Sequence, residues 1–255
     1  MKNTFARLPL FSVILLMAMA WASCDKTENT PKNTGTVKLR FKATHNGEPF
    51  VINQIYRDFL NHRIRVEQFK SYFNNIYLVK EDDTQVMLKD VILVNFGSGA
   101  EVVTSVPVGK YKALHVGMGV PKEQNKDQDP TQYPETHPLS STGSQGMFWH
   151  WNTGYIFTKY EGKTDLDGVD GNPLADSFAF HIGDDALHRE KTFEADIKVH
   201  GDNVLVLTLE IDCFKLFSSD FDSIDIADES LTHTSGNLVL AERFTELLSA
   251  ALTLK

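Results

Sequence analysis

Cysteine is scarce in this sequence. Only Cys24 and Cys213 occur among 255 residues. If Cys24 belongs to a membrane anchor, as described below, no disulfide can form within the chain. Cys213 closes a run of alternating apolar residues over 205–211, and we interpret it as a small buried side chain rather than a ligand or a nucleophile. The fold must then be stabilised by its hydrophobic core and not by covalent bridges.

Positive charge is also in short supply. Lys and Arg together number 25 against 34 Asp and Glu, which gives a formal net charge of −9. Binding to nucleic acid needs a basic face that neutralises phosphates, so the composition argues against a nucleic-acid partner.

The motifs of the common enzyme classes are missing. The sequence has no Gly-x-Ser-x-Gly elbow, no phosphate-binding glycine loop, no dinucleotide fingerprint, no His-Glu-x-x-His helix and no Cys-x-x-Cys pair. Carboxylates are plentiful, but the sequence does not say which of them meet in space. We expect a protein that is not an enzyme, with a hydrolase of an unrecognised type as the open alternative.

The N-terminus has the features of a bacterial lipoprotein leader. Two basic residues, Lys2 and Arg7, precede an apolar run over 8–20, and small residues stand directly before Cys24. That run is short for a membrane span, and no later apolar run approaches membrane-spanning length. We predict a signal peptide over 1–23, a lipid on Cys24 and a flexible polar tether over 24–35.

This leader predicts a location outside the cytoplasm. The protein would be secreted across the inner membrane and anchored at the outer membrane or cell surface, touching the membrane only through its lipid. Trp21 is unusual three positions before a lipidated cysteine, which leaves a soluble periplasmic protein as the alternative.

Residues 36–255 predict a single all-β domain. Val37, Leu39 and Phe41 alternate with basic residues, as in a strand with one buried face, and Asn46-Gly47 is a hairpin turn. Similar short strands recur, including hairpins expected over 102–118 and 193–214. Apolar residues at 241, 244, 248 and 251 predict a final helix capped by Asn237. We expect an antiparallel β-sandwich or barrel with long loops and a short C-terminal helix.

A long polar connection over 121–146 leads into the most unusual stretch of the chain. Aromatic residues gather there around Trp149-His150-Trp151, with Met147 before them and Tyr155 after. Aromatic side chains in strands usually fill a core, and core packing without any ligand is the simplest interpretation. Long loops in compact domains are often functional, so this connection could cover a site beside the tryptophans.

Histidine supplies the candidate metal ligands. The nine histidines form no His-x-His pair and no helical pair, so a metal site would have to be assembled from distant strands and loops. Imidazole suits copper and zinc, while a thioether such as that of Met147 favours reduced copper.

Several strings together resemble the MbnP-like copper-binding proteins. They are Gly-Met-Phe-Trp-His-Trp-Asn-Thr-Gly-Tyr over 146–155, Gly-Val-Pro over 119–121 with Asn125, Phe-His-Ile-Gly over 180–183, and Phe-Asn-Asn-Ile-Tyr-Leu over 73–78. The resemblance runs from about Thr36 to the C-terminus, and the tryptophan string is its most specific part.

The resemblance implies a copper site. Members of this family bind one copper ion through histidines and a kynurenine, which a di-haem peroxidase-like partner makes from tryptophan. Here the modified residue would be Trp149 or Trp151, and the histidines would be His181, then His150, then His233, with His137 a weaker candidate. In a regular strand His150 points away from both tryptophans, so a bulge or turn would be needed for it to join them.

Two functions are therefore open. The first is an extracytoplasmic copper-binding protein for copper acquisition or handling, with no catalytic activity. The second is a surface module in which Trp149, Trp151 and Tyr155 form an aromatic platform for a sugar or a peptide. Copper binding requires at least two imidazoles close to one point, whereas a platform requires an exposed aromatic face. A pure scaffold would bury both tryptophans.

Overall fold

The computed structural model describes residues 33–126, 128–149, 154–167 and 169–255. The predicted signal peptide, Cys24 and most of the predicted tether lie outside the described residues, so those expectations stay predictions. The described residues from 33 onward belong to one compact unit. No helix among them is long and apolar enough to cross a membrane.

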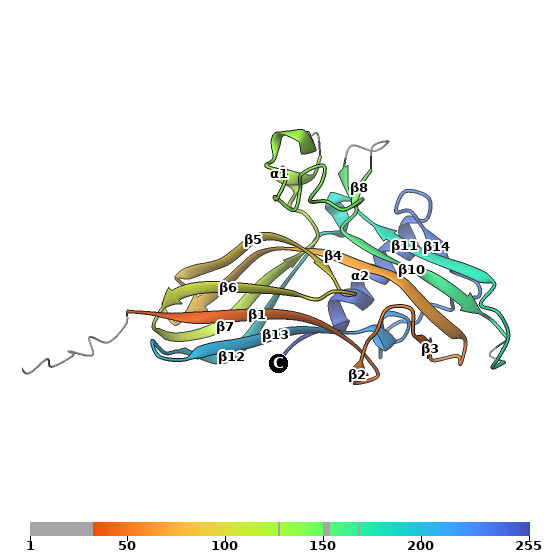
Figure 1. Ribbon diagram of the computed structural model, residues 1–255, viewed down its shortest axis with the longest axis horizontal. Coiled ribbons are helices and arrows are strands. Elements are labelled where there is room, and N and C mark those ends of the chain that lie inside the picture. Colours follow the sequence, from red (N-terminus) through yellow and green to blue (C-terminus); the bar gives the residue numbers. More distant parts are fainter. Residues whose placement is uncertain (1–32, 127, 150–153, 168) are drawn as a thin grey trace, which may run out of the picture. The chain divides into compact units, whose positions relative to one another are not determined.

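Two β-sheets pack face to face and are not closed into a barrel (Figure 1). The first sheet consists of β1 (Thr34–His45), β2 (Glu48–Pro49), β6 (Ala100–Pro107), β13 (Val204–Asp212) and β15 (Leu252–Leu254). Its central strand is β1, which pairs with β13 on one side and with β6 and β2 on the other. β15 pairs with the far side of β13. The predicted all-β sandwich is confirmed, and the barrel alternative is not what forms.

The second sheet is built on one long strand, β4 (Arg63–Lys80). Its second half pairs with β7 and β5, whereas its first half pairs with β10 and β3. The other strands of this sheet are β3 (Ile55–Arg57), β5 (Gln85–Asn95), β7 (Gly109–Met118), β10 (Thr158–Asp165), β11 (Asp176–Ile182), β12 (Arg189–Val199) and β14 (Leu231–Thr232). We call the β10, β11 and β14 side of β4 the C-terminal wing, and this wing carries the candidate site.

Both predicted hairpins over 102–118 and 193–214 are wrong. β6 belongs to the first sheet and β7 to the second, and β12 and β13 are divided in the same way. The turns after Pro107 and Val199 therefore cross from one sheet to the other. β13 pairs with β1 in parallel. Alternation shows which side chains are buried, but it does not show which strand lies alongside, and this is why the expectation failed.

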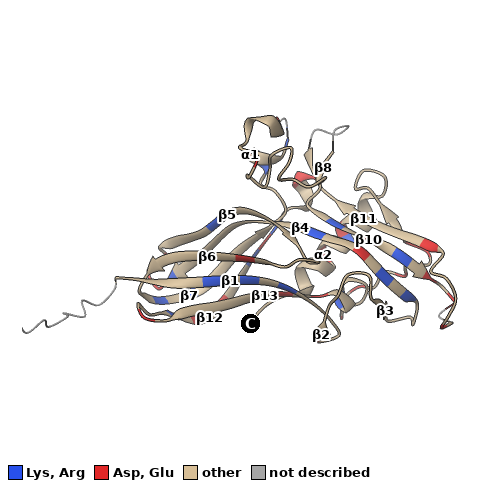
Figure 2. Cartoon of the chain, viewed as in Figure 1, with Lys and Arg blue, Asp and Glu red and all other residues tan. Residues whose placement is uncertain are grey.

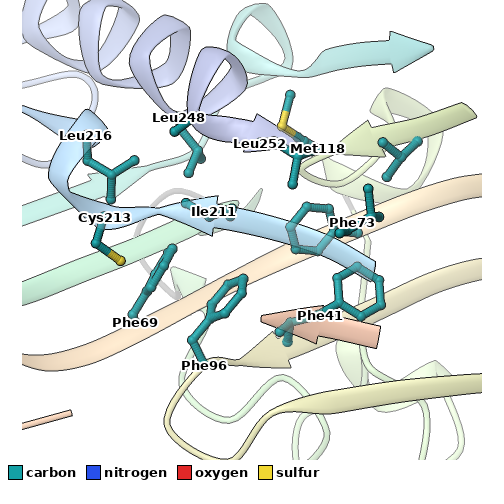
Figure 3. Packing of buried hydrophobic residues seen from close by; sticks show 14 of the residues in the cluster. Phe41, Phe69, Phe73, Phe96, Met118, Ile211, Cys213, Leu216, Leu248 and Leu252 are labelled. Carbon is teal, nitrogen blue, oxygen red and sulfur yellow. The ribbon is translucent and has the colours of Figure 1, made fainter. Parts of the chain in front are cut away.

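The core lies between the two sheets and is closed by α2 (Leu238–Ala251). Phe41, Phe69 and Phe73 fill it from the strands and Phe96 from the turn directly after β5 (Figure 3), and all four are buried. The predicted helix is confirmed, and the side chain of Asn237 accepts a hydrogen bond from the backbone N–H of Leu240 at 3.1 Å.

Cys213 is buried and free, as expected for a small core side chain. It begins the short 3-10 helix η3 (Cys213–Leu216) just after β13 ends.

A second, smaller hydrophobic cluster forms where the long connection folds back. The connection contains α1 (Lys122–Asn125) and the 3-10 helix η1 (Pro130–Gln132), and it leads into the strand pair β8 (Phe148–Trp149) and β9 (Gly154–Tyr155). Tyr72 and Tyr155 tie the connection down, because their hydroxyls donate to the carbonyls of Pro138 and Leu139 at 2.8 and 2.5 Å. The connection is therefore packed on β4 and not a loose loop.

Replacing Phe244 by alanine tests the assignment of the buried face of α2. Phe244 is fully buried and stacks on Phe180 with ring centroids 4.5 Å apart. We expect a loss of about 3–5 kcal/mol in the free energy of unfolding in urea, because the cavity cannot collapse between two sheets. Val239→Ala on the same helix, at a side chain 67% exposed, is the control and should cost less than about 0.5 kcal/mol. Equal losses for the two variants would contradict the assignment.

Candidate functional site

His181 lies on the outer face of the C-terminal wing. Along β11, Phe178, Phe180 and Ile182 point into the core, so His181 between them points the other way. The neighbouring strand β10 places Lys159 directly opposite His181. This alternation puts a histidine beside charged side chains.

Parallel pairing of β14 with β11 brings His233 to His181. Phe180 pairs with Thr232, so His181 on β11 and His233, the residue directly after β14, lie side by side. Their ring centroids are 4.6 Å apart, with an angle of 38° between the planes. Two of the predicted metal ligands, 52 positions apart in the sequence, thus meet on one surface.

Thr234 holds the two histidine strands together. Its hydroxyl accepts a hydrogen bond from the backbone N–H of Gly183 and donates one to the carbonyl of His181, both at 2.9 Å. Its backbone is in the left-handed region, with φ of 57°, a strained conformation for a β-branched residue. The chain therefore turns directly after His233, and the Thr234 hydroxyl fixes this turn to the backbone of His181 and Gly183.

A carboxylate contacts the first histidine. Glu161 Oε2 lies 2.5 Å from His181 Nε2, and the other oxygen of Glu161 accepts a hydrogen bond from the Gln68 amide, also at 2.5 Å. Burial lowers the pKa of His181, the positive charge of Lys159 and the neighbouring His233 ring lower it further, and Glu161 opposes this by raising it. The lowered pKa favours the neutral ring, in which one nitrogen keeps a lone pair.

Basic side chains surround this polar cluster. Lys70 on β4 lies directly opposite Lys159 on β10, and Figure 2 shows basic residues on β4 and β10 with acidic residues among them. Burial, together with the charge of Lys159, lowers the pKa of Lys70. The Lys70 ammonium donates to the carbonyl of Gln145, in the connection before the tryptophan string, at 3.0 Å.

Trp149 lies close to the end of β11 that carries His181. It is 6% exposed and packs in the second hydrophobic cluster with Met147 and Tyr155. A Cβ built on Gly183 would lie 2.8 Å from Trp149 Cζ3, so the six-membered ring of the indole rests against the backbone just beyond His181. The absence of a side chain at Gly183 is what permits this close approach.

The other predicted site residues have different outcomes. His150, Trp151 and Cys24 lie outside the described residues. His137 stacks on Tyr133 with ring centroids 4.5 Å apart, and its Nδ1 accepts from the N–H of Leu139, which is a role in holding the connection. Within the described ranges, no group of three His, Cys, Asp or Glu residues is placed to hold one metal ion.

The aromatic-platform interpretation is wrong for two of its three residues. Tyr155 is fully buried and Trp149 is nearly so, so neither offers a flat face to a sugar or peptide. Trp151 lies outside the described residues. The two aromatic side chains pack inward because the connection over 121–147 folds over them.

Sequence reasoning missed Glu161 and Gln68. Glu161 is recognisable as an outer-face residue from its place between Tyr160 and Gly162 in an alternating segment. Its partners are not recognisable, because they depend on the register of β10 against β4 and β11.

The described residues form a β-sandwich in which His181 and His233 lie side by side on an outer face and Trp149 packs against Gly183. A family model described as MbnP matches residues 34–236, and the chain belongs to the MbnP family. A search of curated proteins found no match.

A solved structure, MbnP from Methylosinus trichosporium, is similar in fold. It shares 16% sequence identity with this chain and has a TM-score of 0.50, and the match covers 75% of this chain and 79% of the other. At this level of identity the similarity concerns the fold alone.

Replacing Gly183 by alanine tests the contact between Trp149 and the histidine strand. The new Cβ would lie 2.3 Å from the Tyr155 carbonyl oxygen as well as against the indole, so the hairpin must shift. We expect a loss of about 1–3 kcal/mol in the free energy of unfolding and a changed tryptophan emission spectrum. Gly236→Ala is the matched control, because a Cβ there meets nothing within 4 Å. If Gly183→Ala matches the wild type in both measurements, the contact does not exist in solution.

Proposed function

We propose that this protein binds a copper ion outside the cytoplasm, for copper acquisition or handling, and does not catalyse a reaction. The observation that carries the proposal is the pairing of His181, in β11, with His233, directly after β14; their ring centroids lie 4.6 Å apart. Both residues are among the ligands that the family resemblance implies, and they lie together on the outer face of the C-terminal wing.

The residues present fit a metal that prefers nitrogen ligands. Imidazole suits copper and zinc, and a ligating histidine must be unprotonated. Burial lowers the pKa of His181 and so favours the neutral ring. The histidines alone do not separate copper from zinc, and the preference for copper rests on the resemblance to MbnP-like copper-binding proteins.

Two imidazoles are few for a metal site, and the tryptophan hairpin is the proposed source of further ligands. β8 ends at Trp149 and β9 begins at Gly154, and His150 and Trp151 stand between them in the sequence. Trp149 rests against Gly183 beside the histidine pair. We propose His150, and a kynurenine formed from Trp149 or Trp151, as the additional ligands.

A kynurenine requires an oxidising partner. By family resemblance, this partner is a di-haem peroxidase-like enzyme that oxidises the tryptophan outside the cytoplasm. Peptide mass spectrometry of the protein purified from its native cells tests the proposal. Kynurenine at position 149 or 151 supports it, and unmodified tryptophan at both positions in copper-loaded protein contradicts it.

Removing either histidine should abolish copper retention. The mature chain, Asp25–Lys255, is incubated with cuprous or cupric ions, desalted and analysed for metal. We expect about one copper per chain for the wild type and almost none for His181→Ala or His233→Ala, because each substitution removes one of the few nitrogen ligands of the proposed site. The control is His200→Ala, at an exposed histidine after β12, which should retain copper. Equal retention by all variants would place the metal elsewhere.

Replacing Cys24 by serine tests the proposed anchor. In a bacterial host that processes lipoproteins, the wild-type chain should sediment with membranes, whereas Cys24→Ser should be released in soluble form because it has no acyl chains to bury in the bilayer. Wild-type protein that is soluble after cell disruption would favour the periplasmic alternative.

A further inference from the structure

We propose that Glu161 is a positioning residue for the metal site. It holds His181 by Nε2, so that Nδ1 is the nitrogen left to coordinate. The statement that Nδ1 coordinates the metal rests on the proposed copper function. The contact between Glu161 and His181 concerns the protein without metal.

The register of the C-terminal wing aims Glu161 at His181. Glu161 on β10 lies directly opposite Ala179 on β11, and His181 is the next residue on the same face. Because Ala179 has only a methyl group, the longer glutamate side chain can extend diagonally across the strand pair. Diagonal neighbours on one face of a sheet are within reach of long side chains, and here the contact is 2.5 Å.

A second residue fixes the carboxylate from the other side. Gln68 lies directly opposite Glu161 on β4 and donates to its Oε1. The pairing of β10 with β4 shifts register between Glu161 and Gly162. A Cβ at Gly162 would lie 2.0 Å from the carbonyl oxygen of Arg65, so this irregular register depends on glycine there. Such irregularities re-aim the side chains beside them.

The donors and acceptors of the two side chains then determine which ring nitrogen of His181 keeps its lone pair. An ionised carboxylate has only acceptors, so the Nε2 that faces it must carry the hydrogen. A neutral imidazole carries one hydrogen, and Nδ1 therefore keeps its lone pair. Carboxylates that hold the second nitrogen of a metal-binding histidine fix its tautomer and orientation, and their loss typically lowers metal affinity by about 10–100-fold.

The first experiment uses metal-free protein with nitrogen-15-labelled histidine. Long-range proton–nitrogen NMR spectra, assigned with His181→Ala, report which ring nitrogen carries the hydrogen. We expect the Nε2–H form at His181, with a downfield proton protected from exchange with water. That proton should disappear in Glu161→Leu and persist in Glu67→Leu, the control on β4. An Nδ1–H form in the wild type, or a proton unaffected by Glu161→Leu, overturns the inference.

The second experiment measures copper affinity by competition with a chelator. We expect Glu161→Leu to bind about 10–100-fold more weakly and Glu161→Gln, which keeps the size and one acceptor, to lie between it and the wild type. Urea unfolding of the variants identifies any that fail to fold. Unchanged affinity in a folded Glu161→Leu protein overturns the positioning role. A wild type that binds no copper instead overturns the proposed function, and the NMR result then decides the Glu161 contact alone.

Discussion

The alternation of β11, combined with its parallel pairing to β14, is the constraint on which the rest of the site depends. Phe180 and Ile182 must face the core that α2 closes, so the residue between them has to face outward. The parallel partner carries its own histidine at the matching position, and Thr234 locks the two strands together through both of its hydrogen bonds. The same packing that stabilises the fold therefore brings two imidazoles to one surface.

The features that the sequence predicts well are those set by neighbouring residues. The burial of Phe178, Phe180 and Ile182, the outward direction of His181 and the Asn237 cap all follow from local patterns. The sheet crossing after Val199 and the parallel pairing of β13 with β1 do not, because strand partners are chosen by packing between distant segments. Glu161 was missed for the same reason, since its contact depends on register and on the small side chain of Ala179.

Two regions with different physical roles meet at Gly183. The C-terminal wing supplies polar side chains from strands whose inner faces are fixed by the core. The long connection over 121–146 leads into the buried aromatic residues of β8 and β9. Hydrogen bonds from the hydroxyls of Tyr72 and Tyr155 to its carbonyls hold this connection in place. Trp149 is therefore positioned by packing while His181 and His233 are positioned by pairing.

Anomalous X-ray diffraction at the copper absorption edge, from crystals of the copper-loaded mature chain, would locate the metal without reference to affinity or stability. We expect one strong anomalous peak within bonding distance of both His181 and His233, close to Trp149. A peak bound to other residues, with this histidine pair free of metal in the same crystal, would contradict the proposed site.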